Sequence, residues 1–261
     1  MTDAWSPDQY HRFRAQRSVP FRDLLALIQP IPGGRAVDLG CGTGELTETL
    51  AGHTGAVDVL GVDSSASMLA KAAEQERPGL RFVAGDLASW GDPADPDHLI
   101  VANAALQWSP DHPGVLQRWT DALAPGGQVA VQVPTNADHA SHRVAAAVAS
   151  EEPFVSMFDG APPPDPVADN VLAPGAYAEL LHRLGYTDQH VRLQVYGMEL
   201  ASSDDVVEWV KGTTLTRFKQ ALPADRYEAF VDTYRTRLRD ELADSRPYFY
   251  AFKRILFWGR L

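Results

Sequence analysis

Short apolar runs alternate with helical patterns between residues 35 and 133. Apolar residues recur one helical turn apart between the runs, as at Leu46 and Leu50 and at Val115, Trp119 and Leu123. Strands that alternate with helices form a parallel sheet with helices on both faces. The pattern therefore predicts a doubly wound α/β fold, with strands at residues 36–39, 57–62, 81–83, 98–102 and 128–133.

Helical patterns also flank this region. Ser6 with Pro7 predicts the cap and first turn of one helix, and Leu24, Leu25 and Ile28 mark a second. A proline-rich loop is predicted at residues 161–174. Beyond it, the pattern predicts helices over 176–184 and 222–242 and strands over 190–198 and 252–259. The two late strands would complete a seven-stranded, mostly parallel, Rossmann-like sheet.

The first predicted strand leads into the loop Gly40-Cys41-Gly42-Thr43-Gly44 and then into a helix. Nucleotide-binding glycine loops have this strand–loop–helix context. Dinucleotide-binding loops follow G-x-G-x-x-G, whereas here the third glycine comes one residue earlier and Asp38 precedes the loop. The pattern D-x-G-x-G-x-G resembles the first motif of class I methyltransferases, in which the acid lies near the amino-acid portion of S-adenosylmethionine.

Further residues at strand ends fit the same cofactor. Asp63 closes the second strand, where an acid accepts hydrogen bonds from ribose hydroxyls. Asp86 follows the third strand, where methyltransferases hold the adenine, and Met68 offers a polarizable contact to the adenine face. Asn103 ends the fourth strand, at the edge where open α/β sheets bind ligands. The predicted cofactor-binding residues are Asp38, Gly40, Gly42, Gly44, Asp63, Ser64, Met68, Asp86, Leu87 and Asn103.

Other motifs are spread from one end of the chain to the other. They are W-x-P-x-x-Y-x-x-F from Trp5, Arg17 with Pro20, VDLGCGTG, GVDSSASML, NAALQW, AVQVPTN, Ser141-His142, EWVKGT and F-x-R-I-L-F from Phe252. Together they resemble the trans-aconitate 2-methyltransferase family. The resemblance implies methyl transfer from S-adenosylmethionine to a carboxylate of a small polycarboxylic acid, giving a monomethyl ester. The chain departs from the family pattern at Ala140 and around Arg217 and Lys219.

A polycarboxylate substrate implies a set of positively charged and polar contacts. Arginine presents a fork of donors that matches a carboxylate, so Arg17, Arg254 and Arg217 are predicted to bind substrate. His142 is predicted to donate to a carboxylate, or to act as a base if the acceptor is a hydroxyl or an amine. Aromatic residues are predicted to exclude water from the site, namely Trp5, Tyr10, Trp108 and Tyr196. Because a carboxylic acid is already ionised at neutral pH, no catalytic side chain is predicted.

Composition narrows the function classes. A formal net charge of −11 argues against a nucleic-acid partner, which requires Lys and Arg to neutralise phosphates. No apolar run approaches the length of a membrane span and the N-terminus lacks a signal-peptide pattern, so we expect a soluble, cytoplasmic protein. The single cysteine, Cys41, is expected to be an inert packing residue, and no closely spaced cluster of His, Asp and Glu predicts a metal site.

We expect three parts: an N-terminal helical lid at residues 1–30, a core that binds S-adenosylmethionine at 31–137, and substrate cap helices with the two last strands at 138–261. Two alternatives remain open: a methyltransferase acting on a hydroxyl or amine of another small molecule, and a catalytically idle module that binds S-adenosylmethionine. A nicotinamide-dependent oxidoreductase is disfavoured, because the glycine spacing is shortened and the chain lacks a Tyr-x-x-x-Lys pair.

Overall fold

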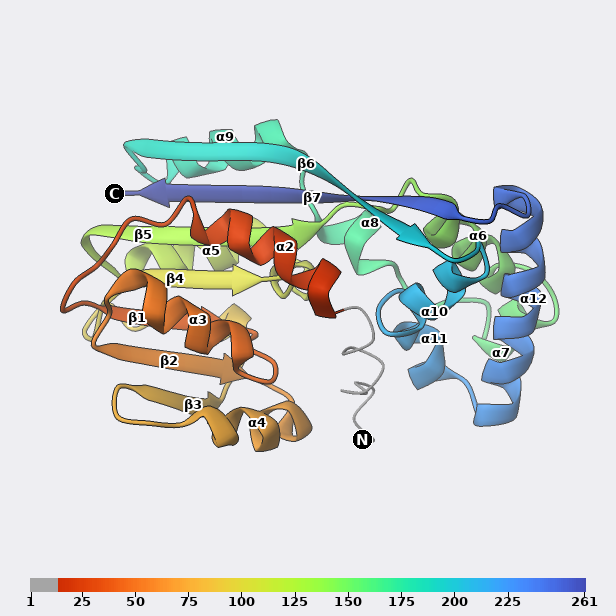
Figure 1. The fold of residues 1–261 in the computed structure, drawn as a ribbon, viewed down its shortest axis with the longest axis horizontal. Helices are drawn as coiled ribbons and strands as arrows, with labels where there is room; N and C mark the ends of the chain where they lie inside the picture. The colour runs from red at the N-terminus through yellow and green to blue at the C-terminus, as the bar shows by residue number, and fades with distance from the viewer. Residues whose placement is uncertain (1–13) are drawn as a thin grey trace. The chain divides into compact units, whose positions relative to one another are not determined.

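A computed structural model describes residues 14–261 of the chain. Seven strands form one sheet in the order β3-β2-β1-β4-β5-β7-β6 (Figure 1). Strands β1 to β5 are parallel, whereas β7 is antiparallel to β5. The predicted seven-stranded, mostly parallel, Rossmann-like sheet is confirmed. Its strands are β1 (Arg35–Leu39), β2 (Asp58–Asp63), β3 (Leu80–Ala84), β4 (Asp97–Asn103), β5 (Leu123–Pro134), β6 (Asp188–Leu200) and β7 (Tyr248–Arg260).

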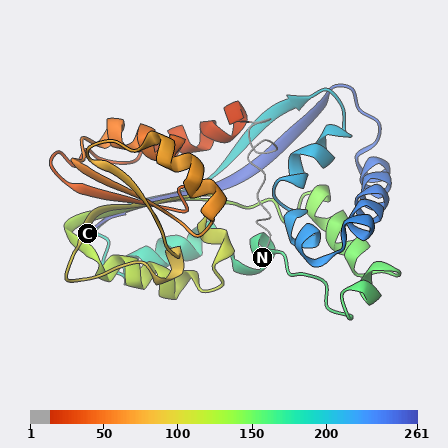
Figure 2. The ribbon, with the colours of Figure 1, turned by 90° about the horizontal axis from the view of Figure 1, so that it is seen from below.

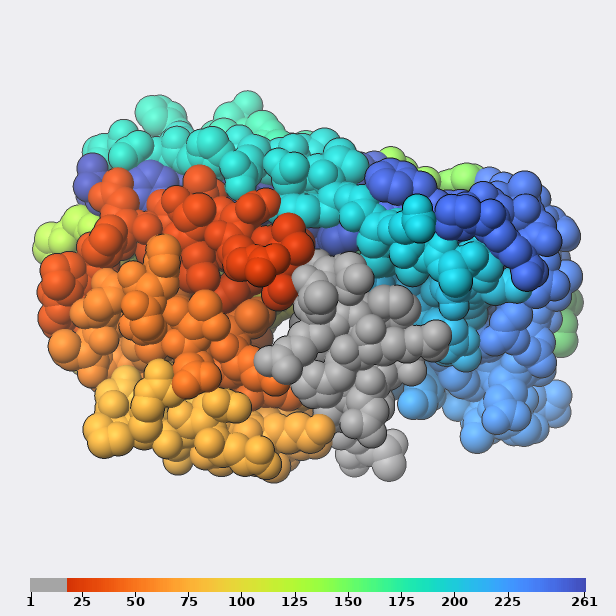
Figure 3. Space-filling view, viewed as in Figure 1, coloured from red at the N-terminus to blue at the C-terminus, as the bar shows by residue number. Residues whose placement is uncertain are grey.

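Helices cover both faces of the sheet. Turning the molecule shows α2 and α3 on one face and α5 and α9 on the other (Figure 2). The helices around the sheet are α2 (Arg14–Leu25), α3 (Glu45–Thr54), α4 (Ala66–Ala72), α5 (His112–Asp121) and α9 (Pro174–Arg183), with short turns of 3₁₀ helix η1 (Ala73–Gln75), η2 (Leu87–Ser89) and η3 (Leu106–Trp108). The segment from α4 to β3, in light orange, forms one margin of the sheet (Figure 3).

Alternation along the strands divides the core into two layers. Val37 and Leu39 of β1 pack with α5 and α9, whereas Ala36, the residue before Val37, packs with α2 and α3. Successive side chains of a strand point to opposite faces, so a strand covered on both faces reads as a continuous apolar run. This is why the short apolar runs identified the strands of the core.

The described residues fall into two compact units. The sheet unit contains Arg17–Pro134, Asn170–Gln194 and Arg254–Leu261, and the helical unit contains Thr135–Asp169 and Val195–Lys253. The three-part division predicted from the sequence stays a prediction. The helices of the helical unit are α6 (Ala140–Ala149), α7 (Phe154–Met157), α10 (Asp205–Lys211), α11 (Thr216–Ala221) and α12 (Ala224–Leu242), and α8 (Pro166–Asn170) crosses the boundary.

Buried aromatic rings hold the helical unit together. Phe230 of α12 contacts Phe154 of α7 and Phe218 of α11, with ring centroids 5.2 and 4.5 Å apart. The Tyr234 hydroxyl donates to the main-chain oxygen of Ser141 over 3.1 Å, which ties α12 to α6. The apolar residues of α12 at helical spacing, which predicted this helix, therefore form the centre of the unit.

Local differences from the sequence predictions have simple causes. Leu123 lies in β5 instead of the preceding helix, because α5 ends at Asp121 and Leu123 pairs with Asp97. The predicted proline-rich loop contains the short helix α8, whose first turn is capped by the Asp165 carboxylate through Val167 N. The predicted helix at Ser6 lies outside the described residues. None of the described helices is both long and apolar enough to cross a membrane.

Candidate functional site

The glycine loop connects β1 to α3 in a conformation that favours glycine. Gly40, Gly42 and Gly44 have φ values of 79°, 56° and 80°, which L side chains rarely adopt. At Gly40 a Cβ would also lie 2.3 Å from the Cβ of Ala105. At Gly42 no atom of the described residues lies within 4 Å of the Cβ position. Gly40 is therefore required by packing as well as by conformation, whereas Gly42 is required by conformation alone as far as the described residues are concerned.

Asp63, the last residue of β2, fastens the glycine loop to the next helix. Its Oδ2 accepts from Gly42 N and its Oδ1 accepts from Ser65 N, each over 2.8 Å. Ser65 in turn caps α4, because its hydroxyl accepts from Met68 N. Each carboxylate oxygen has a second lone pair. Asp63 can therefore accept ligand hydroxyls while it holds the loop.

Asp38 of β1 is buried behind the loop. Its Oδ2 accepts from the Thr47 hydroxyl over 2.6 Å. Burial, reinforced by the nearby charge of Asp63 and opposed by the Thr47 hydrogen bond, raises the pKa of Asp38 to about 6. Its ionised form therefore becomes dominant only near neutral pH, and a cationic ligand beside it would favour that form.

The remaining predicted cofactor residues lie at the same edge of the sheet. Asp86 is exposed and caps η2 by accepting from Ala88 N, and Met68 is buried in the first turn of α4. Ser64 is exposed, whereas Leu87 is half-buried against the core. Since β1 to β4 are parallel, their carboxyl ends meet at one edge, the place where doubly wound sheets bind ligands.

The charges in the segments that follow β1 to β4 at this edge are of one sign. The segments 40–45, 63–68, 84–90 and 103–108 contain Glu45, Asp63 and Asp86 but no lysine or arginine. Carboxylates accept hydrogen bonds from hydroxyls and ammonium groups and repel phosphates. This set of acceptors therefore fits a ligand that carries an ammonium group, a positive sulfur and ribose hydroxyls.

Burial makes Cys41 unreactive. Its sulfur is buried next to Gly61. This burial is the chief reason that the pKa of the Cys41 thiol is raised well above the usual range. Thiolates are the reactive form of cysteine. The side chain therefore packs the loop, as the sequence indicated.

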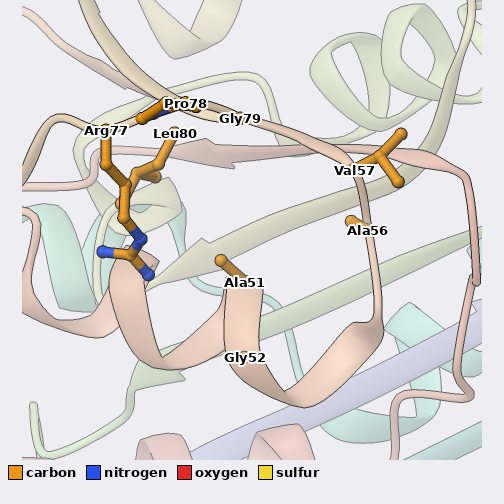
Figure 4. Close-up of a pocket in the computed structure, with 8 residues that line it drawn as sticks. All are labelled: Ala51, Gly52, Ala56, Val57, Arg77, Pro78, Gly79 and Leu80. Carbon is orange, nitrogen blue, oxygen red and sulfur yellow. The ribbon is translucent and has the colours of Figure 1, made fainter.

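A hollow lies at the opposite edge of the sheet, away from the carboxyl ends of the parallel strands (Figure 4). It is lined by residues that precede β2 and β3, including Val57 and Gly79, and by Ala51 of α3. Arg77 beside it forms an ion pair with Glu48. These residues lie at the amino ends of the strands, so the hollow is separate from the carboxyl edge.

In the helical unit, His142 lies in a chain of buried polar groups. His142 Nδ1 is 2.9 Å from Asp165 Oδ2, and its Nε2 is 3.0 Å from the Thr214 hydroxyl. Arg217 Nη1 is 3.1 Å from the same Asp165 oxygen and donates to Pro164 O. The structure thus brings together two predicted substrate residues, His142 and Arg217, and adds Asp165 and Thr214.

The other predicted substrate residues are described each within its own unit. Trp108 of η3 is exposed, and Tyr196 of β6 is buried and stacks on Phe252. Arg254 belongs to the sheet unit, where it lies half-buried in β7 opposite Pro134. Three predicted side chains fall outside the described part of the structure: Trp5, Tyr10 and the side chain of Arg17.

Comparison with known proteins places the chain in a family. Residues 36–127 match the family model of a methyltransferase domain. A trans-aconitate 2-methyltransferase of Deinococcus radiodurans is 47% identical over 97% of this chain and 96% of the relative, and one from Streptomyces avermitilis is 40% identical over 97% and 95%. The chain belongs to the trans-aconitate 2-methyltransferase family. Membership confirms the predicted enzyme class, a methyltransferase that depends on S-adenosylmethionine.

Solved structures agree with the fold. The YcgJ protein of Bacillus subtilis superposes with a TM-score of 0.58 at 14% identity, over 92% of this chain and 97% of that chain. A phosphoethanolamine N-methyltransferase of Haemonchus contortus, solved with S-adenosylhomocysteine, gives 0.52 at 18% identity, over 92% and 52%. At these identities the likeness concerns the fold alone.

Several residues that shape the site are not predicted from the sequence. Thr47 and Ala105 are ordinary residues in a helix and a loop, and nothing local marks them. Gln132 carries a detectable signal, because it is a polar residue inside the apolar run 128–133. Asp165 and Thr214 lie 23 and 72 residues from His142, so only the tertiary structure joins them.

We expect Asp165 to stabilise the helical unit in a pH-dependent way. Burial alone would raise the pKa of Asp165, but the His142 hydrogen bond and the charges of His142 and Arg217 outweigh it and lower that pKa to about 2. A depressed carboxyl pKa contributes stability that is present above pH 4 and lost as the pH falls towards 2. Asp165→Asn should lower the free energy of unfolding by roughly 3 kcal/mol at pH 7.

Urea unfolding at pH 7, 4 and 3 measures this effect as the gap between the wild type and D165N, which should narrow as the pH falls. Asp225→Asn is the control, because Asp225 is an exposed partner of Arg226 and should change stability by less than about 0.5 kcal/mol. A gap that stays constant down to pH 3 would contradict the proposed ionic role of Asp165.

Proposed function

We propose that this chain transfers the methyl group of S-adenosylmethionine to a carboxylate of trans-aconitate, giving a monomethyl ester. The observation that carries the proposal is the 47% identity, over nearly the whole of both chains, to a trans-aconitate 2-methyltransferase. The acidic carboxyl edge of the sheet and the buried Arg217–Asp165–His142 cluster support it from the structure.

The cofactor would be held by the residues of the carboxyl edge. Asp63 would accept from the ribose hydroxyls, Asp86 from the adenine amine, and Asp38 would favour the positively charged amino-acid portion. Since no atom of residues 14–261 lies within 4 Å of the Cβ position of Gly42, a ligand can approach the loop backbone closely. When bound, S-adenosylmethionine supplies a methyl group on a positively charged sulfur.

The acceptor carboxylate requires orientation and no proton transfer. A carboxylic acid with a pKa near 4 is ionised at neutral pH, so its oxygen is already nucleophilic. Arg17, Arg217 and Arg254 are the proposed carboxylate contacts, with His142 as a further donor and Trp5, Tyr10, Trp108 and Tyr196 as aromatic contacts. The alternative of a hydroxyl or amine acceptor needs His142 as base. Both ring nitrogens of His142 have partners, so either role, donor or base, requires His142 to exchange one of them.

The raised pKa of Asp38 predicts a pH dependence of cofactor binding. The ionised carboxylate attracts a cationic ligand, and its population rises about tenfold between pH 5 and pH 7 when the pKa is about 6. We expect the affinity for S-adenosylmethionine to rise by about the same factor. Asp38→Asn should bind more weakly at pH 7 and with little pH dependence, as measured by isothermal titration calorimetry. The same slope in D38N as in the wild type would exclude Asp38 as its source.

The substrate is tested by transfer of a labelled methyl group to trans-aconitate, cis-aconitate, citrate and isocitrate. We expect base-labile label on trans-aconitate, because carboxyl esters are hydrolysed by base whereas methyl ethers and methylamines are not. Absence of transfer to every acid, with S-adenosylmethionine still bound, would overturn the substrate and leave the methyltransferase class intact.

A further inference from the structure

Gln132 is a buried polar residue that does little for the stability of the sheet. Its side chain is 2% exposed and makes one hydrogen bond, in which Nε2 donates to Asn103 Oδ1 over 3.1 Å. Among residues 14–261 its Oε1 has no hydrogen-bond partner. A buried amide oxygen without a partner destabilises the folded state, so an apolar residue of similar size would pack this position better. Gln132 therefore calls for an explanation other than packing.

Gln128, four residues earlier in the same strand, provides the contrast. Its amide makes three hydrogen bonds: Oε1 accepts from Gln29 N and from Trp258 Nε1, and Nε2 donates to Gln29 O. Both the oxygen and the nitrogen of that amide take part in joining three segments of the sheet unit. Gln128 thus has a structural role, whereas the one side-chain hydrogen bond of Gln132 goes to Asn103, at the carboxyl edge.

The segment that Gln132 holds is unusual in its own right. The main-chain oxygen of Gln132 accepts from Ala104 N over 2.8 Å, so the residue grips the end of β4 through backbone and side chain. Ala104 has φ 54°, a left-handed conformation that costs an alanine about 1 kcal/mol. Strained residues of this kind persist where the surroundings fix them, often at functional sites. The next residue, Ala105, packs against Gly40 of the glycine loop.

The Gln132 bond decides which end of the Asn103 amide is turned to a ligand. Because Oδ1 accepts from Gln132, the end left for a ligand is Nδ2, which carries two N–H donors. The charged side chains that directly follow β1 to β4 are all acids, and the cation Arg254 lies opposite Pro134, beyond β5. Asn103 therefore adds, at the end of β4, a side-chain donor suited to an anionic group. A carboxylate is the anionic group of both reactants.

We propose that Gln132 is a positioning residue that aims the Asn103 amide nitrogen at a ligand carboxylate. The carboxylate belongs either to the amino-acid portion of S-adenosylmethionine or to the methyl acceptor. This inference rests on the proposed function for the identity of the methyl acceptor. The possibility that the carboxylate belongs to the methyl donor can be tested with S-adenosylmethionine alone.

The test compares Gln132→Met with Gln128→Met in the full chain. Dissociation constants for S-adenosylmethionine and for decarboxylated S-adenosylmethionine are measured by calorimetry. KM and kcat for trans-aconitate are measured in a methyl-transfer assay. Melting temperatures are recorded for each variant. We expect Q132M to keep or raise the melting temperature, since it removes an unpaired buried oxygen, whereas Q128M should lower it. Q128M should leave the ratio of the two dissociation constants unchanged.

Two outcomes support the proposal and identify the carboxylate. About tenfold weaker binding of S-adenosylmethionine by Q132M, with the decarboxylated analogue unaffected, assigns the contact to the methyl donor. Unchanged donor binding with about tenfold higher KM for trans-aconitate and retained kcat assigns it to the acceptor. Equal weakening of both donors, or no change in any of these constants, would overturn the proposal. The donor arm holds even if trans-aconitate proves not to be a substrate.

Asn103→Asp provides a second test that does not depend on Q132M folding. The substitution is isosteric and keeps an acceptor for Gln132 Nε2, but it replaces the N–H donors with a second carboxylate oxygen. We expect weaker binding of the carboxylate-bearing ligand and unchanged or tighter binding of the decarboxylated donor. A double variant N103A/Q132M should bind no worse than N103A, because Gln132 acts through Asn103; additive losses would contradict this.

Discussion

Gly40→Ala is expected to destabilise the protein by roughly 3 to 5 kcal/mol, a large part of the total stability of an ordinary domain. Part of the cost is the φ of 79°, which an alanine adopts at about 1 kcal/mol. The larger part is steric, because the new Cβ would lie 2.3 Å from the Cβ of Ala105, where carbon atoms prefer about 3.5 to 4 Å. Urea unfolding monitored by circular dichroism measures the loss.

Gly33→Ala separates the two contributions. Gly33 has nearly the same φ, 76°, but no atom of the described residues lies within 4 Å of its Cβ position. G33A should therefore cost about 1 kcal/mol. Removing the opposing methyl group in the double variant G40A/A105G should recover most of the steric loss. Equal costs for G33A and G40A would show that the contact with Ala105 is easily relieved.

Asp63→Ala is expected to weaken the binding of S-adenosylmethionine by a factor of about 100 or more. The variant loses two hydrogen bonds from backbone amides to a carboxylate, each worth about 1.5 to 3 kcal/mol, so the glycine loop and the start of α4 are no longer held. It also removes the proposed acceptor for the ribose hydroxyls. Calorimetric titration with S-adenosylmethionine measures the effect.

Asp92→Ala is the matched control for this variant. Asp92 accepts from the amide two residues ahead, Ala94 N, just as Asp63 accepts from Ser65 N, but it lies in the loop that leads to the amino end of β4. D92A should leave binding unchanged. If D63A retains binding within a few-fold of the wild type, the carboxylate holds neither the loop nor the ribose.

The two variants probe different requirements of the same loop. Gly40 is needed so that the loop can pack against the end of β4, and its loss is felt as instability. Asp63 joins the loop to the neighbouring strand end, so its loss affects ligand binding as well as stability. Binding by D63A is therefore measured under conditions in which the variant is folded.

The sequence by itself determined the sheet and the position of the cofactor edge. Apolar runs such as residues 98–102 reflect strands buried on both faces, and this signal is local. Once the strands are known to be parallel, residues that follow them must meet at one edge, so Asp63 and Asn103 could be placed without any contact information. The shortened glycine spacing likewise distinguishes this loop from dinucleotide-binding loops, and this signal is contained in the five residues 40–44.

What only the tertiary structure decided are the interactions between residues far apart in the chain. The raised pKa of Asp38 depends on burial and on Thr47, and the orientation of Asn103 depends on Gln132, which is 29 residues away. The Thr214–His142–Asp165 chain joins three segments that share no pattern. Local periodicity indicates how deeply a residue is buried, but it carries no information on which distant polar group the residue contacts. Those contacts are set by the packing of whole helices and strands. They are therefore decided only when the chain folds.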